Sequence, residues 1–267
     1  MRRYSLAYLT ASALSASAMV RLAAELGYAE VGLRLQPNAA GAPFQSWLDD
    51  PAEQRETLAA LHDTGVGVFD LEIVRIGADF DPQQHRRLFE AGALLQAKAV
   101  LVAGDDGDLP RLADGYARLC ELAQPYGLSC DLEFMPWTAV PDARTALQVV
   151  DAAGRPRAAG ILVDALHAGR SRTTLADLQA LPPQLLHYAQ VCDAPGLPEP
   201  TVPQLIHTAR CERLLPDEGV IDLRGIFASL PAELPLSVEI PHDVRVARVG
   251  TREWARAALA ACRAVLG

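Results

Sequence analysis

The stretch from Leu128 to Asp164 reads LSCDLEFMPWTAVPDARTALQVVDAAGRPRAAGILVD and contains one complete strand–helix–strand unit. Its first apolar run, Leu128–Phe134, and its last, Gly160–Asp164, have the length and composition of buried strands. The segment between them, Asp142–Ala153, has apolar residues at helical spacing and is followed by Gly154, a common helix stop. Two strands joined through a helix lie parallel in one sheet with a right-handed crossover.

The same alternation continues along the rest of the chain. Short apolar runs predict further strands at Tyr4–Thr10, Ala29–Gln36, Val66–Val74, Ala99–Ala103, Leu186–Cys192 and Leu236–Ile240. Amphipathic segments predict further helices at Asp81–Ala97, Leu109–Tyr126, Thr174–Ala180, Asp222–Ser229 and Thr251–Leu266. Eight such units in 267 residues fit an α/β fold of the (β/α)8 TIM-barrel type, which we expect as a single domain over residues 1–267. The longest irregular segment, Ala194–Asp222, is expected to cap the face that carries the active site.

An open doubly wound sheet is the alternative fold. It usually has a glycine-rich turn after its first strand, but here that turn reads Thr10-Ala11-Ser12-Ala13. The chain contains no G-x-G-x-x-G, which also counts against a bound dinucleotide. Lys98 is the one lysine and precedes a predicted strand, on the opposite side from TIM-barrel active sites, so Schiff-base chemistry is not expected. We therefore favour the closed barrel.

Composition limits the kinds of binding partner and the cellular compartment that we expect for this chain. A net charge of −9 argues against a nucleic-acid partner, and no apolar run approaches the roughly 18–20 residues that cross a bilayer. The five cysteines are widely spaced with no C-x-x-C, which favours reduced thiols and a cytoplasmic location. The first twenty residues resemble a weak secretory signal. We prefer to interpret them as the strand Tyr4–Thr10 and a helix to Leu26, because cleavage would remove the first strand of the barrel.

Oxygen-bearing side chains end several predicted strands. Glu133, Asp164, Gln190 and Glu239 stand at the ends of four consecutive strands, and Glu72 has the equivalent place on the third strand. The carboxyl ends of barrel strands meet at the mouth, where TIM-barrel enzymes have their active sites. Carboxylates that converge in an apolar mouth repel one another, so a cation is expected among them. Oxygen ligands favour Mn²⁺ or Mg²⁺, while Co²⁺ and Zn²⁺ are also compatible.

Longer motifs around these positions resemble the xylose isomerase-like TIM barrels. This group includes sugar phosphate isomerases and epimerases, inosose dehydratases and 3-dehydroshikimate dehydratases. The resemblance covers nearly the whole chain, and its motifs are Leu132–Trp137, Val163–Ser171, Gln190–Pro195, Arg213–Gly219 and Val238–Pro241. It implies one divalent metal ion whose ligands are Glu133, Asp164, Gln190 and Glu239. Many members carry histidine where this chain has Gln190, and glutamine followed by Asp-Ala-Pro resembles the dehydroshikimate dehydratases more closely.

The resemblance implies an isomerase or epimerase that acts on a small keto-sugar or polyol. Glu133 and Glu239 would act as base and acid in proton abstraction next to a carbonyl, through a metal-stabilised enediolate. Substrate contacts are expected from Glu72, His167, Arg210 and Trp137, although a backbone-bonded histidine, a surface arginine and a core tryptophan are structural alternatives. A metal-dependent dehydratase of the 3-dehydroshikimate or inosose type is the second hypothesis, because it begins with the same proton abstraction.

Two further classes are left as alternatives. A DNA repair enzyme of the endonuclease IV class would need three zinc ions and several additional histidines, whereas the corresponding strand ends here carry Glu72 and Asp105. A metal-free binding or regulatory barrel would need its strand-end carboxylates paired with arginines. The expected partner is thus a small polyhydroxylated carbonyl compound rather than a nucleic acid or a membrane, and a homo-oligomer is compatible with the sequence.

Overall fold

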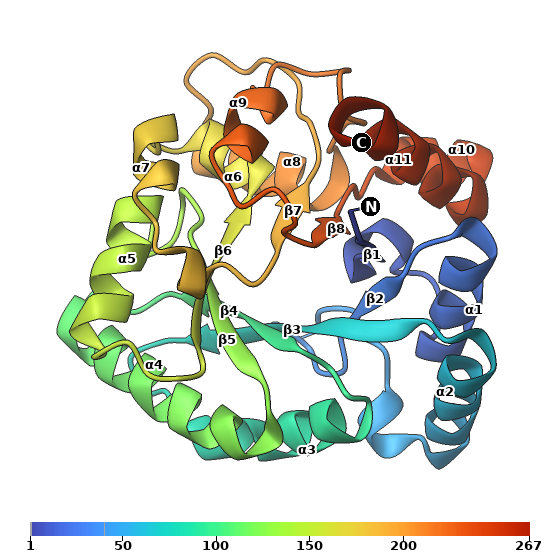
Figure 1. Ribbon diagram of the computed structural model, residues 1–267, viewed down its shortest axis with the longest axis horizontal. Coiled ribbons are helices and arrows are strands. Elements are labelled where there is room, and N and C mark those ends of the chain that lie inside the picture. Colours follow the sequence, from blue (N-terminus) through green and yellow to red (C-terminus); the bar gives the residue numbers. More distant parts are fainter. Residues whose placement is uncertain (1, 40) are drawn as a thin grey trace.

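A closed barrel of eight parallel strands forms the centre of the computed structural model, which describes residues 2–39 and 41–267 (Figure 1). The strands are β1 (Tyr4–Leu6), β2 (Glu30–Leu33), β3 (Gly67–Ile76), β4 (Ala99–Gly104), β5 (Ser129–Glu133), β6 (Ala159–Asp164), β7 (Ala189–Val191) and β8 (Leu236–Val238). Each strand pairs with the next, and β8 pairs with β1. The predicted (β/α)8 TIM barrel is confirmed.

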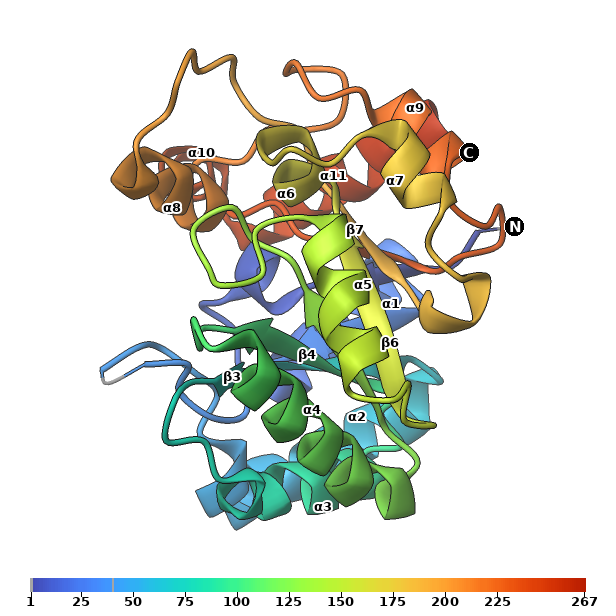
Figure 2. The same cartoon turned by 90° about the vertical axis from the view of Figure 1, so that its left-hand side faces the viewer.

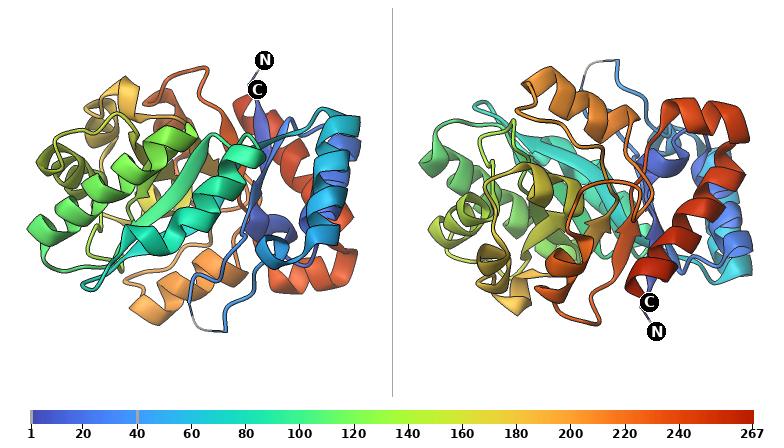
Figure 3. Two further views of the ribbon diagram at one scale, coloured as in Figure 1. Left: turned by 90° about the horizontal axis from the view of Figure 1, so that it is seen from below. Right: turned by 90° about the horizontal axis from the view of Figure 1, so that it is seen from above.

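Helices surround the barrel on its outside. The α-helices are α1 (Ala16–Leu26), α2 (Pro51–Thr64), α3 (Arg86–Leu94), α4 (Leu109–Ala123), α5 (Ala143–Ala152), α6 (Ala165–Arg170), α7 (Leu175–Gln179), α8 (Val202–Cys211), α9 (Leu223–Ala228), α10 (Asp243–Val249) and α11 (Thr251–Leu266). Figure 2 shows α4 and α5 outside the strands, and α11 lies beside α1 in both views of Figure 3. Across residues 2–39 and 41–267, no helix combines the length and apolar character needed to cross a bilayer.

The amino-terminal segment closes the barrel, but its strand is shorter than predicted. Strand β1 ends at Leu6, and the 3-10 turn η1 (Tyr8–Ala11) takes up the rest of the predicted strand. The side chain of Thr10 explains the early end, because its hydroxyl donates to the Val238 carbonyl at 2.8 Å and accepts from the Ile240 amide at 2.7 Å. A side chain thereby replaces the next backbone pairing with β8.

The segment Ala194–Asp222 is less irregular than expected, because it contains α8. A proline in the first turn of a helix is tolerated, so Pro203 does not prevent this helix from forming. Gln204 Oε1 also accepts from the Thr201 backbone amide at 2.9 Å, which stabilises the helix start. The Asp193 carboxylate accepts from the amides of Gly219 (2.9 Å) and Ile221 (3.0 Å), which holds the rest of the segment near the end of β7.

The strands separate two apolar regions. Side chains such as Leu6, Leu33 and Val238 pack outward against the helices in the main core. A smaller cluster fills the barrel interior and includes Phe69 and Tyr188, whose ring centroids are 4.9 Å apart. This interior cluster forms the floor beneath the polar side chains at the strand ends.

Candidate active site

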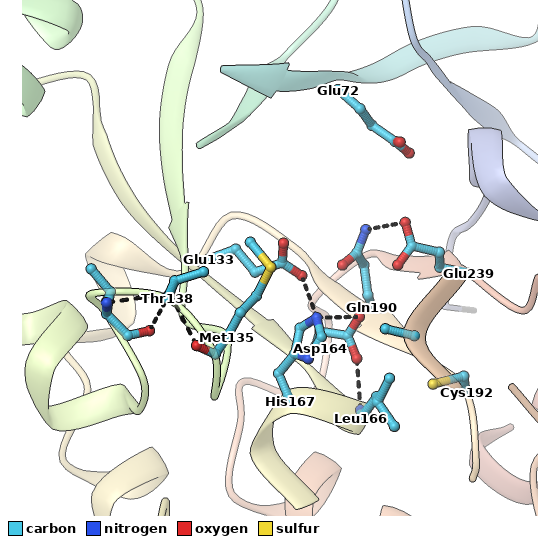
Figure 4. A network of polar contacts seen from close by, with 12 residues as sticks. Glu72, Glu133, Met135, Thr138, Asp164, Leu166, His167, Gln190, Cys192 and Glu239 are labelled. Atoms are coloured by element: carbon cyan, nitrogen blue, oxygen red, sulfur yellow. Dashed lines mark hydrogen bonds and ion pairs between the residues drawn. The ribbon is translucent and has the colours of Figure 1, made fainter. Parts of the chain in front are cut away.

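Four of the predicted site residues lie together at the carboxyl ends of β5 to β8. Glu133 ends β5, Asp164 ends β6, Gln190 is in β7 next to Asp164 in the strand register, and Glu239 directly follows β8. None of the four is more than 4% exposed. Their side chains converge in the mouth of the barrel (Figure 4). The closed barrel thus brings together groups that are about 100 residues apart in the chain.

Asp164 positions His167 through the start of helix α6. The Asp164 Oδ1 atom accepts from the Leu166 amide at 2.6 Å and so caps the helix. The first turn of α6 then places His167 Nε2 3.5 Å from Glu133 Oε1 and 3.9 Å from Asp164 Oδ2. One ligand atom from each of these three residues lies within 4.8 Å of the others, so Glu133, Asp164 and His167 could hold a metal ion.

The His167 imidazole is neutral at ordinary pH. Burial lowers its pKa to about 4, which outweighs the opposite effect of the Asp164 charge. The Trp137 ring packs edge-on against it, with ring centroids 5.0 Å apart. In the described part of the chain, His167 Nδ1 has no hydrogen-bond partner. The imidazole is therefore held by packing rather than by the backbone.

A buried arginine that was not predicted as a site residue lies between two of the carboxylates. Arg213 Nη1 is 2.7 Å from Asp164 Oδ2, and Arg213 Nη2 is 2.7 Å from Glu239 Oε2. The second oxygen of Glu239 accepts from Gln190 Nε2 at 3.1 Å. Both oxygens of Glu239 are thereby engaged, so Glu239 is held more firmly than Glu133.

The three carboxylates differ in their electrostatics. Burial raises the pKa of Glu239 to about 8, although the Arg213 charge opposes this shift. Burial and the neighbouring Asp164 and Glu239 charges raise the pKa of Glu133 well above its usual value. Burial also disfavours ionisation of Asp164, but Arg213 outweighs it and the pKa of Asp164 is lowered. Glu133 is thus the carboxylate of this cluster that most needs a further positive charge.

Glu72 is not part of this cluster. It lies on β3, and Figure 4 shows its side chain apart from the others. Its Oε2 atom is 2.8 Å from Arg34 Nη2 in a buried ion pair, and the Arg34 guanidinium lies over the Tyr8 ring at 4.5 Å. Strand β3 continues past Glu72 to Ile76, so the predicted equivalence of Glu72 with the other strand-end acids holds neither for its place along the strand nor for its partners.

A cavity opens above the cluster, and all four predicted substrate contacts line it. These residues are Glu72, Trp137, His167 and Arg210. Arg34, Arg75 and Arg213 are also in the lining, and each has an acidic partner; for Arg75 this is Asp105, at 2.6 Å. Arg210 is exposed, and no hydrogen bond or ion pair of its side chain occurs within residues 2–39 and 41–267. It is the cation at this opening that is free to meet a ligand.

The donor atoms fit a divalent metal ion. Arg213 pairs with Asp164 and Glu239, whereas Glu133 has no cationic partner among the described residues. Gln190 Oε1 is buried without a hydrogen-bond partner there, and the neutral His167 offers Nε2 beside Glu133. Carboxylate, amide and imidazole donors suit Mn²⁺, Mg²⁺, Co²⁺ and Zn²⁺. The arginine pairing expected of a metal-free barrel is therefore present only in part.

The sequence matches the family described as xylose isomerase-like TIM barrel over residues 20–265. The chain belongs to this family. The resemblance noted from the strand-end motifs is thus confirmed over nearly the whole chain. A comparison with curated protein sequences gives no match.

Several solved structures have folds similar to that of this xylose isomerase-like barrel. IolI with a bound zinc atom matches with a TM-score of 0.78 and 17% identity, over 99% of this chain and 98% of that one. A fusion of a xylose isomerase-like barrel with 4-hydroxyphenylpyruvate dioxygenase has a TM-score of 0.80 and 22% identity, covering 97% of this chain and 42% of the fusion. The probable 3-DHS dehydratase AsbF of Bacillus anthracis has a TM-score of 0.75 and 15% identity, with 98% of both chains covered. At these identities the matches establish the shared fold.

Within this xylose isomerase-like site, Arg213 and Arg34 are the residues that sequence reasoning missed. The motif Arg213–Gly219 contributed to the family resemblance, but nothing in it showed that its first residue enters the barrel mouth. The signal that could have pointed to them is the excess of buried acid, because buried carboxylates need cations nearby.

Proposed function

We propose that the chain is a divalent-metal-dependent enzyme that removes a proton from the carbon next to a carbonyl group of a small polyhydroxylated substrate. The proposed metal ligands are Glu133, Asp164, Gln190 and Glu239. A divalent ion, when bound, polarises the substrate oxygens as a Lewis acid. The proposal places the enzyme in the cytoplasm, in keeping with five cysteines that are all free.

Our choice between a dehydratase and an isomerase or epimerase rests on the exposed cation Arg210. A guanidinium with no acidic partner at the cavity opening suits a carboxylate, which it can bind with two parallel hydrogen bonds. Dehydroshikimate carries a carboxylate, whereas ketoses and inososes do not. We therefore favour dehydration of a carboxylate-bearing β-hydroxy ketone, as in the dehydratase named from the sequence as second hypothesis.

In this proposal Glu133 and His167 carry out the proton transfers. Glu133 accepts the proton from the carbon next to the carbonyl, because within residues 2–39 and 41–267 its oxygens pair with no guanidinium, while those of Glu239 are engaged. The electron pair of that C–H bond forms the new double bond, and the C–O bond to the leaving hydroxyl breaks. The hydroxyl leaves as water with a proton relayed through His167, 3.5 Å from Glu133 Oε1.

An isomerase or epimerase, the first hypothesis from the sequence, is the second candidate. Glu133 and Glu239 stand at the ends of β5 and β8, so they approach a bound substrate from different sides. Epimerisation needs a proton removed from one face and returned to the other. Fold matches include a D-allulose 3-epimerase of a Methylomonas species and a D-psicose 3-epimerase, both at or below 16% identity.

One NMR experiment separates the two candidates. The Mn²⁺-loaded protein is incubated in D2O with dehydroshikimate, an inosose, D-fructose and D-allulose, and the metal is chelated before spectra are recorded. We expect an unsaturated product from dehydroshikimate and a KM that rises at least tenfold in Arg210→Gln, since a charged hydrogen bond is lost. Deuterium incorporation into a ketose without loss of water would favour the epimerase instead. No reaction with any of these compounds would contradict both candidates.

A further inference from the structure

We propose that Arg213 is a positioning residue of the metal centre, which stays between Asp164 and Glu239 when a divalent ion is bound and aligns the ligands from behind. The inference rests on the metal dependence proposed above. It differs from the simpler interpretation that the guanidinium occupies the place of the ion and leaves when the ion binds. The two interpretations predict opposite effects of removing Arg213.

Contacts that involve no carboxylate fix the Arg213 side chain. Its Nε atom donates to the Ala209 carbonyl at 2.8 Å, in the last turn of α8. Its Nη1 atom donates to the Glu239 backbone carbonyl at 3.2 Å and lies 3.4 Å from Cys192 Sγ. The backbone amide of Arg213 donates to the Pro241 carbonyl at 2.9 Å. The guanidinium is thus built into the ends of α8, β7 and β8 and is 2% exposed.

Displacement of the guanidinium would be unfavourable. The cavity beside it is already lined by Arg34, Arg75 and Arg210, so an outward movement would bring like charges together. The Ala209 carbonyl, which is buried, would also lose its donor. An arriving ion is therefore expected to bind on the side of Glu133 and His167 while Arg213 remains in place.

Arg213 also sets the orientation of the other ligands. It binds Glu239 Oε2, and the second oxygen of Glu239 draws the Gln190 amide nitrogen toward itself at 3.1 Å. The Gln190 amide oxygen is thereby turned away from Glu239, toward the side of the site where Glu133 lies (Figure 4). That oxygen is buried and has no hydrogen-bond partner in the described residues. Arg213 also orients Asp164, because its Nη1 atom donates to Asp164 Oδ2 while the Leu166 amide donates to Asp164 Oδ1.

Metal affinity in the absence of substrate tests this inference. The Arg213→Lys variant keeps the positive charge but cannot bridge two carboxylates with a planar fork. Arg224→Gln is the matched control, because Arg224 is 73% exposed and 3.9 Å from Asp217. Mn²⁺ is titrated into each apoprotein by calorimetry and by EPR of the free ion. We expect R213K to bind Mn²⁺ roughly 10- to 100-fold more weakly than the wild type, and R224Q to be unchanged. Equal or tighter binding by R213K would overturn the inference.

Two further measurements separate positioning from a general structural role. At saturating Mn²⁺, the EPR spectrum of the bound ion should change in R213K and not in R224Q, because the ligands are reoriented. A crystal structure of the Mn²⁺-loaded wild type should keep the guanidinium within hydrogen-bond distance of Asp164 and Glu239, a result that requires no variant to fold. A guanidinium that has left both carboxylates would overturn the inference.

The outcome also distinguishes this inference from the proposed function. A wild type that binds Mn²⁺ beside an R213K that binds it equally well contradicts the positioning role alone. A wild type that binds none of Mn²⁺, Mg²⁺, Co²⁺ or Zn²⁺ contradicts the metal dependence and, with it, the role of Arg213.

Discussion

Arg34 Nη2 lies 2.8 Å from Glu72 Oε2, and both side chains are almost fully buried in the barrel mouth. Arg213 forms a second buried pairing there, with Asp164 and Glu239. Two buried guanidinium groups of the mouth are therefore each matched to particular acids. Glu133, in contrast, has the neutral His167 as its neighbour and pairs with no arginine in the part of the chain that the structure describes.

The Arg34–Glu72 pair should be important for stability. Arg34→Met keeps the length of the side chain but leaves the Glu72 charge buried without a partner. We expect the free energy of unfolding in urea to fall by about 3–5 kcal/mol. The double variant R34M/E72L should recover much of this loss, because no buried charge is left. R87M, at the exposed pair with Asp49, is the control and should lose less than about 1 kcal/mol. Similar losses for the buried and exposed pairs would contradict the prediction.

Glu133 should be essential for turnover and dispensable for folding. Glu133→Gln keeps the shape of the side chain but cannot accept a proton. We expect kcat at saturating Mn²⁺ to fall by about 10²- to 10⁴-fold, with an unchanged circular dichroism spectrum. Glu253→Gln, on the outer helix α11, is the matched control. An E133Q protein with wild-type turnover would show that the proton acceptor is another group.

A hydrogen bond at the amino-terminal end of the barrel should make stability depend on pH. His187 Nδ1 lies 2.7 Å from Asp131 Oδ1, and this hydrogen bond raises the His187 pKa above the usual histidine value of about 6.5. The folded state therefore binds the proton more tightly than the unfolded state. The resulting stability is full below about pH 6.5 and is lost as pH rises through the higher folded pKa.

The variant His187→Gln tests this pH dependence. It should flatten the decrease in Tm between about pH 6 and pH 8, by an equivalent of at most about 1 kcal/mol because the imidazole is partly exposed. His62→Gln is the control, since the His62 side chain is 89% exposed. An unchanged pH profile in H187Q would show that protonation of His187 beside Asp131 contributes nothing to stability in this pH range.

Metal removal should abolish turnover and lower thermal stability together. Dialysis against a chelator is expected to eliminate activity, and added Mn²⁺ should restore it. An ion at 100 times its Kd stabilises the folded state by about 2.7 kcal/mol, so Tm should rise with the Mn²⁺ concentration. Turnover is assayed after chelation and again after Mn²⁺ is added. Tm is measured on the same samples by thermal unfolding followed by fluorescence. A chelated protein with full activity would refute the proposed metal dependence.

The convergence of the four proposed metal ligands could be predicted because it follows from strand geometry. Glu133, Asp164, Gln190 and Glu239 each interrupt or end an apolar run, and the carboxyl ends of parallel strands in a closed barrel meet at one mouth. That inference needs the number of strands and their order, both of which are visible in the apolar pattern.

The pairing of these acids could not be predicted in the same way. Arg213 reaches the mouth because α8 and the preceding connection fold over β7, and no local pattern encodes that path. The same holds for Arg34, whose partner Glu72 was expected to resemble the other strand-end acids. The early end of β1 could not be predicted either. There the Thr10 side chain replaces a backbone hydrogen bond, and this depends on the neighbouring strand β8.

The pairing of β1 with β8 has a consequence during synthesis on the ribosome. Tyr4 and Leu236 are partners in the sheet although roughly 230 residues separate them in the sequence. One edge of β1 therefore stays unpaired until β8 has been synthesised. Such distant pairings form slowly, and unpaired strand edges promote aggregation. Of the eight barrel strands, β1 is thus the one that a nascent-chain chaperone would have to shield for longest.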